Sequence, residues 1–306
     1  MKKRTLLLLL LGLFFIGVGY ALYKKYPYYS LKQNFEYNKN KLNMIISQKI
    51  INKINVPIYY INLDRSPQRK KFMEHQFEHY NITNYKRISG VDGKQLNNIL
   101  KDNINGSSFT NNYPDLTKNE VGCLLSHLKA IKTAYNNNLQ EVLILEDDCS
   151  LDLMFFWEDD KITSLLNKLN KPDWEIFQLY TGNCIDFNSK KCTLQTGKKD
   201  CWGCVAYLIN RKGMEKIINF IKTNNQNEIL LGKYFNNNLF PTRGQSDIFL
   251  YQIAKTYYLD IPLFCTNNSN LQSTIVSYNN GDQFAIDISN KIIKHYLKES
   301  AKNKVQ

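Results

Sequence analysis

Short apolar stretches alternate with segments of helical periodicity from about residue 56 onward, and this alternation predicts an α/β domain. The clearest strand is Val142–Leu145, whose unbroken apolar run suggests a parallel sheet covered on both faces. The clearest helix follows Thr117, where TKNE forms a capping box ahead of apolar residues at helical spacing. Further strands are expected at 57–62, 85–88, 174–179 and 205–209, and further helices at 66–79, after the caps Asn210 and Ser246, and at 285–297.

The first residues predict a membrane anchor. Three basic residues at 2–4 precede an apolar run at 6–23, which as a helix is about 27 Å long, close to the thickness of a bilayer core. No convincing cleavage site follows, so we interpret the run as an uncleaved signal anchor rather than a cleaved signal peptide. We expect a single-pass protein with a cytosolic N-terminus and its main domain lumenal or external, in an ER- or Golgi-like compartment if the host is eukaryotic.

The composition divides the chain into four parts. These are a cytosolic tip and anchor at 1–23, a polar stem at 24–55, the α/β domain at 56–280, and a basic amphipathic helix with a tail at 281–306. The last part suits either a packed helix or a surface helix.

The net charge narrows the classes of binding partner that we expect. The formal charge is +13, but the lysines are scattered and no nucleic-acid-binding motif is present, so we expect no nucleic-acid partner. A positive field would still favour a phosphorylated ligand.

Four of the seven cysteines lie between Cys184 and Cys204 and can form one or two disulfides in an oxidising compartment, with the pairing open. Cys201 and Cys204 lack the second Cys-x-x-Cys of a zinc ribbon.

Three carboxylates, Glu146, Asp147 and Asp148, directly follow the apolar strand. Ligands of open α/β sheets bind beyond the carboxyl ends of the strands. Mg²⁺ and Mn²⁺ prefer oxygen ligands, and such an ion can neutralise the charge that develops on a departing nucleoside diphosphate. The triplet therefore predicts a divalent-metal site, with a solvated strand end as the alternative. A second acidic triplet at 158–160 is explained by a helix N-terminus.

Several blocks, in the same order, resemble glycosyltransferase family 25, which includes lipooligosaccharide and procollagen hydroxylysine galactosyltransferases. The main blocks are INLDRSPQR at 61–69, NEVGCLLSHLKA at 119–130 and VLILEDDCSLD at 142–152, with GVDG at 90–93, GCVAYLINRKG at 203–213, SDIFLY at 246–251 and QSTI at 272–275. The resemblance covers about residues 56–276. It implies a GT-A-like fold with a mixed central sheet. It also implies metal-dependent, inverting transfer of a hexose, most often galactose from UDP-galactose, to a glycan or to hydroxylysine of a collagen-like protein.

The resemblance also suggests roles for residues outside the acidic cluster. Asn62, Asp64 and Arg69 would seat the nucleotide, Arg69 pairing with the diphosphate or with Asp64. The alternative for Asp64 and Arg69 is a local ion pair at the helix start. Ser126 and His127 would contact a phosphate or sugar, or His127 would orient a metal-binding carboxylate, the alternative being a structural histidine.

Inversion requires a base for the acceptor hydroxyl, and Asp247 in SDIFLY is the candidate. Asp247 can instead cap its helix or contact the donor sugar. The competing hypothesis for the whole chain is a catalytically inactive, membrane-tethered binding or adhesion protein built on the same fold. The intact triplet at 146–148 favours the enzyme.

Overall fold

The computed structural model describes residues 33–34, 36–41, 52–96, 117–157, 161–189, 192–194, 201–221, 245–267 and 279–303. The expected anchor at 6–23, most of the expected stem, the second acidic triplet and the QSTI block lie outside these residues. Within the described ranges, no helix is long and apolar enough to cross a membrane.

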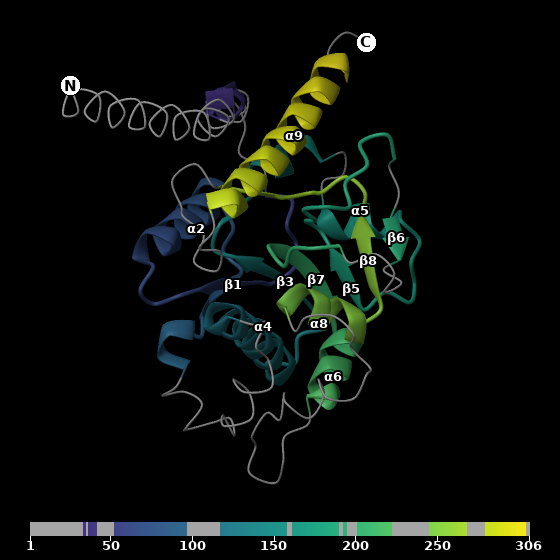
Figure 1. The fold of residues 1–306 in the computed structure, drawn as a ribbon. Coiled ribbons are helices and arrows are strands. Elements are labelled where there is room, and N and C mark those ends of the chain that lie inside the picture. Colours follow the sequence, from purple (N-terminus) through teal and green to yellow (C-terminus); the bar gives the residue numbers. More distant parts are fainter. Residues whose placement is uncertain are drawn as a thin grey trace, which may run out of the picture.

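A seven-stranded mixed sheet forms the centre of the molecule, in the order β2-β1-β3-β7-β5-β8-β6 (Figure 1). β1 pairs in parallel with both β2 and β3, whereas β7 runs antiparallel to β3 and β5. The expected mixed sheet is confirmed, and the parallel pairing that the apolar run suggested holds on only one side of β3. The strands are β1 (Ile58–Asn62), β2 (Tyr85–Ser89), β3 (Glu141–Glu146), β5 (Ile176–Gln178), β6 (Cys192–Leu194), β7 (Ala206–Asn210) and β8 (Thr256–Leu259).

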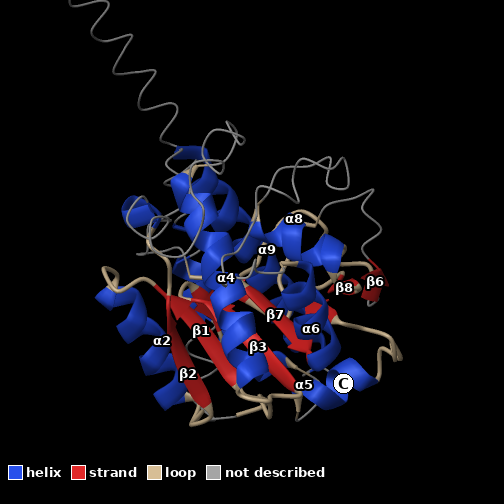
Figure 2. Ribbon diagram, turned by 90° about the horizontal axis from the view of Figure 1, so that it is seen from below, coloured by secondary structure: helices blue, strands red, loops and turns tan. Residues whose placement is uncertain are grey.

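Helices cover both faces of the sheet, as the four buried apolar residues in the middle of β3 require, and Figure 2 shows α4 and α6 lying across it. Successive residues of β3 point to opposite faces, so Leu143 and Leu145 join one core cluster while Val142 and Ile144 join the other. The first cluster packs against α2 (Pro67–His79), α5 (Ile162–Asn167) and α9 (Asn279–Asn303), and the second against α4 (Lys118–Asn136), α6 (Arg211–Phe220) and α8 (Ser246–Ile253).

Capping residues explain where the helices begin. The predicted capping box is confirmed: Thr117 Oγ1 accepts from Glu120 N at 3.2 Å, and the Glu120 carboxylate accepts from Thr117 N at 2.7 Å. Asn210 caps α6 as predicted, because its side chain accepts from Gly213 N. Ser66 occupies the N-cap position of α2 and Pro67 begins the helix, as predicted, although the Ser66 side chain makes no capping bond. The cap expected at Ser246 was wrong, because Ser246 is the first residue of α8.

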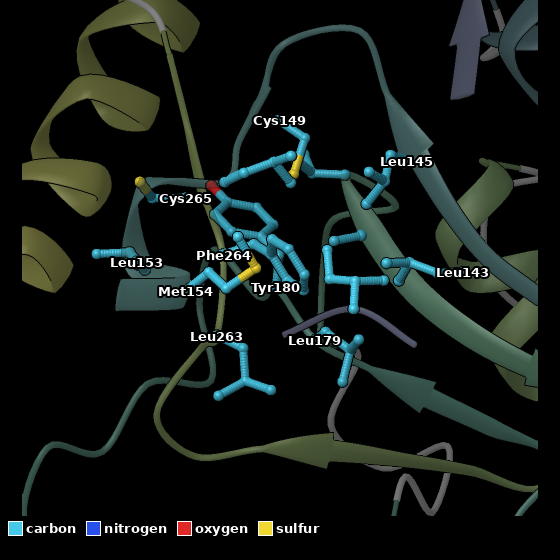
Figure 3. Packing of buried hydrophobic residues seen from close by; sticks show 14 of the residues in the cluster. Leu143, Leu145, Cys149, Leu153, Met154, Leu179, Tyr180, Leu263, Phe264 and Cys265 are labelled. Atoms are coloured by element: carbon cyan, nitrogen blue, oxygen red, sulfur yellow. The ribbon is translucent and has the colours of Figure 1, made fainter. Parts of the chain in front are cut away.

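The segment after the acidic cluster is fixed by a second layer of buried residues. β4 (Cys149–Ser150) pairs with β9 (Cys265–Thr266), and Tyr180 and Phe264 pack beside them (Figure 3). Short 3-10 helices lie at Gly93–Gln95 (η1) and Asp152–Phe156 (η2). One disulfide joins Cys184 to Cys201, within the cysteine-rich stretch whose pairing the sequence left open.

The C-terminal helix α9 is a packed helix rather than a surface helix. Ile286, Ile292 and Ile293 are almost completely buried in the first core cluster. Ser289 is buried too, and its hydroxyl donates to or accepts from the hydroxyl of Thr266 at 2.8 Å. The helix therefore stabilises β9 and, through β4, the segment that follows the acidic cluster.

Replacing Ile292 with Ala should lower the free energy of unfolding by about 2–5 kcal/mol, because it leaves a cavity in a packed core. The control Lys294→Ala, on the exposed side of α9, should change it by less than about 0.5 kcal/mol. Chemical denaturation of the full chain measures both. Equal, small effects would mean that α9 does not contribute to the core.

Candidate active site

A pocket opens beyond the carboxyl ends of β1 and β3, where the two parallel strands bring their last residues to the same edge of the sheet. Five segments contribute to it: the residues that follow β1, the first turns of α2, the turn after β2, helix α4 and the end of β3. Its lining includes Ile61, Leu63, Arg65, Arg69, Val91, Asn119, Cys123, Ser126, His127, Glu146, Asp147 and Asp148.

Arg69 organises the acidic cluster. Its Nη1 lies 2.6 Å from Asp147 Oδ1 and its Nη2 lies 2.7 Å from Asp148 Oδ2, so one guanidinium pairs with two carboxylates. Asn62 completes the contact, because its Nδ2 donates to Asp147 Oδ2 at 2.7 Å. Arg69 reaches these acids from α2 and does not form the local ion pair with Asp64 that the sequence left open.

Burial dominates the electrostatics of the cluster. It raises the pKa of Asp147 to about 7, even though Arg69 and Asn62 favour the ionised form, and neighbouring Asp148 raises it further. Burial also raises the pKa of Asp148. Within the described part of the chain, Asp148 Oδ1 and Arg69 Nε are buried without a hydrogen-bond partner. An acceptor oxygen left in this way is chemically suited to coordinate a cation.

His127 links the acidic cluster to the interior. Its Nε2 lies 3.2 Å from Glu146 Oε1, and its Nδ1 lies 3.1 Å from the hydroxyl of Tyr207, a fully buried residue of β7. The imidazole therefore orients Glu146, which fits the supporting role considered for it. Cys123, one turn earlier on α4, has its pKa raised well above the usual value by burial and then by the charge of Glu146, so its thiol stays protonated.

Ser126 lies in the pocket wall, and its hydroxyl makes contacts to the backbone. It donates to Gly122 O at 2.6 Å and accepts from Val91 N at 2.8 Å. These bonds join the GVDG turn to α4. The turn lies so close to α4 that a Cβ on Gly122 would be 2.6 Å from Val91 O, which explains why this position is a glycine.

Arg87 is a residue that sequence reasoning missed. Its Nε donates to Asn62 Oδ1 at 2.9 Å, and its Nη2 lies 2.5 Å from Asp64 Oδ1. This hydrogen bond, followed by one from Ser89, lowers the pKa of Asp64, which is largely exposed and is not among the described residues that line the pocket. Only the pairing of β1 with β2, which the sequence analysis did not predict, could have suggested that Arg87 lies beside Asn62.

Asp247 lies in the first turn of α8, near the same edge of the sheet. Its Oδ2 accepts from Gly203 N at 2.8 Å and its Oδ1 from Ile248 N at 2.9 Å, while burial raises its pKa. Gly203 has a φ of 112°, a conformation that favours glycine. Two residues later, Val205 O accepts from Glu146 N at 2.9 Å, so the Gly203–Val205 segment connects Asp247 with the acidic cluster.

Comparison with known proteins agrees with these features. Residues 55–230 match the family model described as glycosyltransferase family 25 (LPS biosynthesis protein). A glycosyltransferase 25 family member of Aedes aegypti is 35% identical over 172 residues, which cover 53% of this chain and 27% of that protein. Procollagen galactosyltransferase 1-A of Xenopus laevis is 27% identical over 188 residues, covering 57% of this chain and 30% of that protein. The matched segments thus span less than a third of these relatives.

Replacing Arg69 with Met should leave two buried carboxylates without their cation and lower the free energy of unfolding by about 3–5 kcal/mol. The loss should be larger at pH 8 than at pH 5.5. A carboxyl whose pKa is raised in the folded state binds its proton more tightly there, so stability falls as pH rises from about 4 through about 7. Removing Arg69 raises the pKa of Asp147 further, so the free energy of unfolding falls more between the two pH values.

Thermal unfolding of both proteins at the two pH values measures the difference. Lys70→Met is the matched control on the same helix, since the exposed Lys70–Glu74 pair contributes at most about 0.5 kcal/mol. A loss of stability for Arg69→Met that is independent of pH would contradict the burial of charged carboxylates behind Arg69.

Proposed function

Because the chain belongs to glycosyltransferase family 25, we propose that it transfers a hexose, galactose in the simplest case, from a UDP-sugar to a hydroxyl of a glycan or of hydroxylysine in a collagen-like protein. The supporting observation is the acidic cluster at the end of β3, which faces a pocket and includes a buried carboxylate oxygen that has no hydrogen-bond partner among the described residues. The Xenopus relative is named a procollagen galactosyltransferase, which supports galactose as the sugar and a collagen-like acceptor. A GT-A-like arrangement, with the nucleotide beyond β1 and β3, is part of the same proposal.

Glu146 and Asp148 would hold a Mn²⁺ or Mg²⁺ ion in this proposal. Asp148 Oδ1 has no hydrogen-bond partner in the part of the chain that the structure describes, and His127 orients Glu146 from 3.2 Å. Asp147 has both oxygens engaged by Arg69 and Asn62, so it supports the site by fixing Arg69 rather than by its own free oxygen. When bound, the ion supplies the positive charge that stabilises the departing diphosphate.

The nucleotide would lie along the residues that follow β1. Arg69 offers its Nε, which no described residue contacts by a hydrogen bond. Asn62 is held between Arg87 and Asp147 by hydrogen bonds of 2.9 Å and 2.7 Å. Asp64 would contact the nucleoside from the exposed rim, where Arg87 holds it in place. Ser126 keeps the pocket wall rigid, and His127 supports Glu146.

Asp247 would act as the base on the acceptor side of an inverting displacement. Both oxygens accept one backbone N–H, which positions the carboxylate, and each oxygen keeps a second lone pair for the acceptor hydroxyl. The raised pKa makes Asp247 a stronger base than an exposed aspartate. The proposed enzyme is tethered by residues 1–23 and acts in a lumen or outside the cell.

The first experiment measures UDP release when the full chain is incubated with a panel of UDP-sugars and Mn²⁺, with and without EDTA. We expect hydrolysis of one donor, abolished by EDTA and reduced by about 10²–10³-fold in Asp148→Asn, because the variant loses a charge that holds the ion. Asp173→Asn, which removes an exposed carboxylate paired with Lys255, is the control. Absence of both hydrolysis and metal-dependent nucleotide binding would favour the inactive binding protein.

A second experiment tests Asp247 through the pH dependence of transfer once an acceptor is known. Rate should fall as pH drops through the raised pKa of Asp247, so the acidic limb should lie above the ordinary value of about 3.9 for an aspartate. Asp247→Asn should lower kcat by about 10²–10⁴-fold and remove this limb, while Asp173→Asn keeps it. An unchanged acidic limb in Asp247→Asn would assign the base to another group.

A further inference from the structure

A thiol, an imidazole and a carboxylate converge on one side of the pocket. The Sγ of Cys123, a ring nitrogen of His127 and a carboxylate oxygen of Glu146 all lie within 4.8 Å of one another. Cys123 and His127 are four residues apart, so they share one face of α4, and Glu146 meets them from the end of β3. All three line the pocket, so the group is accessible to small ions.

The geometry of this group is close to that of a metal site. A tetrahedral zinc ion with usual bond lengths brings its nitrogen, oxygen and sulfur ligands to about 3.4–3.6 Å from one another. His127 Nε2 and Glu146 Oε1 already lie 3.2 Å apart. Cys123 Sγ lies within 4.8 Å of ligand atoms of both residues and 3.4 Å from Ser246 Oγ, so completing the set requires the thiol to turn toward them.

The imidazole also has the support that metal-binding histidines usually have. His127 Nδ1 lies 3.1 Å from the hydroxyl of Tyr207, which is fully buried and therefore fixed in position. This contact leaves Nε2 directed toward Glu146 and the pocket. A hydrogen-bond partner on the second nitrogen sets both the tautomer and the orientation of a metal ligand.

The chemistry of the three ligands selects a different ion from that of the proposed donor site. Thiolate and imidazole favour Zn²⁺ over the oxygen-preferring Mn²⁺ and Mg²⁺. Asp148 offers only oxygen ligands, so it suits the site for Mn²⁺ or Mg²⁺. Glu146 lies between the two kinds of site, since it contacts His127 and directly precedes the two aspartates in sequence.

We propose that Cys123, His127 and Glu146 bind one Zn²⁺ ion, with the pocket supplying water as the fourth ligand, and that zinc bound there inhibits the transferase by withdrawing Glu146 from the donor's metal. The thiol proton is released to solvent when zinc binds. Zinc binding stands independently of the proposed function, whereas the inhibition rests on it.

Cobalt(II) provides the direct test, because a thiolate bound to Co²⁺ gives an intense near-ultraviolet charge-transfer absorption. The metal-free full chain is titrated with Co²⁺ and then with Zn²⁺. We expect the absorption to saturate at one Co²⁺ per chain, to disappear on addition of Zn²⁺, and to be absent in Cys123→Ser. Zinc affinity should fall by about 100-fold or more in Cys123→Ser, and by about 10-fold in Tyr207→Phe, which removes only the supporting hydroxyl.

Cys204→Ser is the matched control, since Cys204 is another free thiol in this region, is buried, and is outside the three-ligand group. It should keep the absorption and bind zinc within about threefold of the unaltered chain. Circular dichroism shows whether each variant is folded. No absorption in the unaltered chain, absorption that persists in Cys123→Ser, or absorption lost in folded Cys204→Ser would overturn the proposal.

Inhibition is measured separately, as the ratio of Mn²⁺-dependent donor hydrolysis with and without Zn²⁺ within each variant. Zinc should lower hydrolysis in the unaltered chain and have at least about tenfold less effect in Cys123→Ser. If the chain hydrolyses no donor, the proposed function fails while the cobalt result still decides the zinc site. If zinc binds without inhibiting an active enzyme, the shared role of Glu146 is wrong.

Discussion

The pairing of one guanidinium with two buried carboxylates is the contact on which the pocket depends. Arg69 holds Asp147 and Asp148 at 2.6 Å and 2.7 Å in an environment that strongly disfavours their charge. Without that cation, the two aspartates would be left as uncompensated charges at the end of a buried strand. The same pairing joins α2 to the end of β3. The ion pairs that neutralise the aspartates therefore also define one wall of the pocket.

The rest of the structure positions the partners of this cluster. Parallel pairing of β1 and β3 brings Asn62 beside Asp147, and antiparallel pairing of β3 with β7 brings Tyr207 beneath His127. The layer formed by β4, β9 and α9 then fixes the chain immediately after Asp148. Each residue of the site thus has a partner contributed by an element distant in sequence, and this leaves few of its polar atoms free. Asp148 Oδ1 and Arg69 Nε are the buried side-chain atoms in the described residues that have no hydrogen-bond partner.

Glu146 is distinguished from its two neighbours by its partner. Arg69 engages both aspartates, whereas Glu146 contacts His127 and lies near Cys123. The acidic triplet appears uniform in sequence but is divided in the structure. The two aspartates offer only oxygen ligands, whereas Glu146 lies beside the nitrogen of His127 and the sulfur of Cys123. This division makes two kinds of metal chemistry possible at one strand end, and it connects the proposed catalytic ion with the proposed inhibitory one.

The amino-acid sequence by itself determined the alternation of strands and helices, the family, and the position of the acidic cluster, because periodicity, capping and the strand-end motif are local patterns. It located β1, β3 and β7 to within about one residue and the first residues of α4 and α6. Of the residues that it proposed for one site, Arg69 and His127 line the same pocket and Asn62 contacts Asp147. The tertiary structure alone decided their partners: that Arg69 pairs with Asp147 and Asp148 rather than with Asp64, that Arg87 holds Asn62, and that α9 belongs to the core. The physical reason is that ion pairing, burial and the pKa shifts they cause depend on which strands are neighbours, and strand order in this mixed sheet joins segments that are more than eighty residues apart.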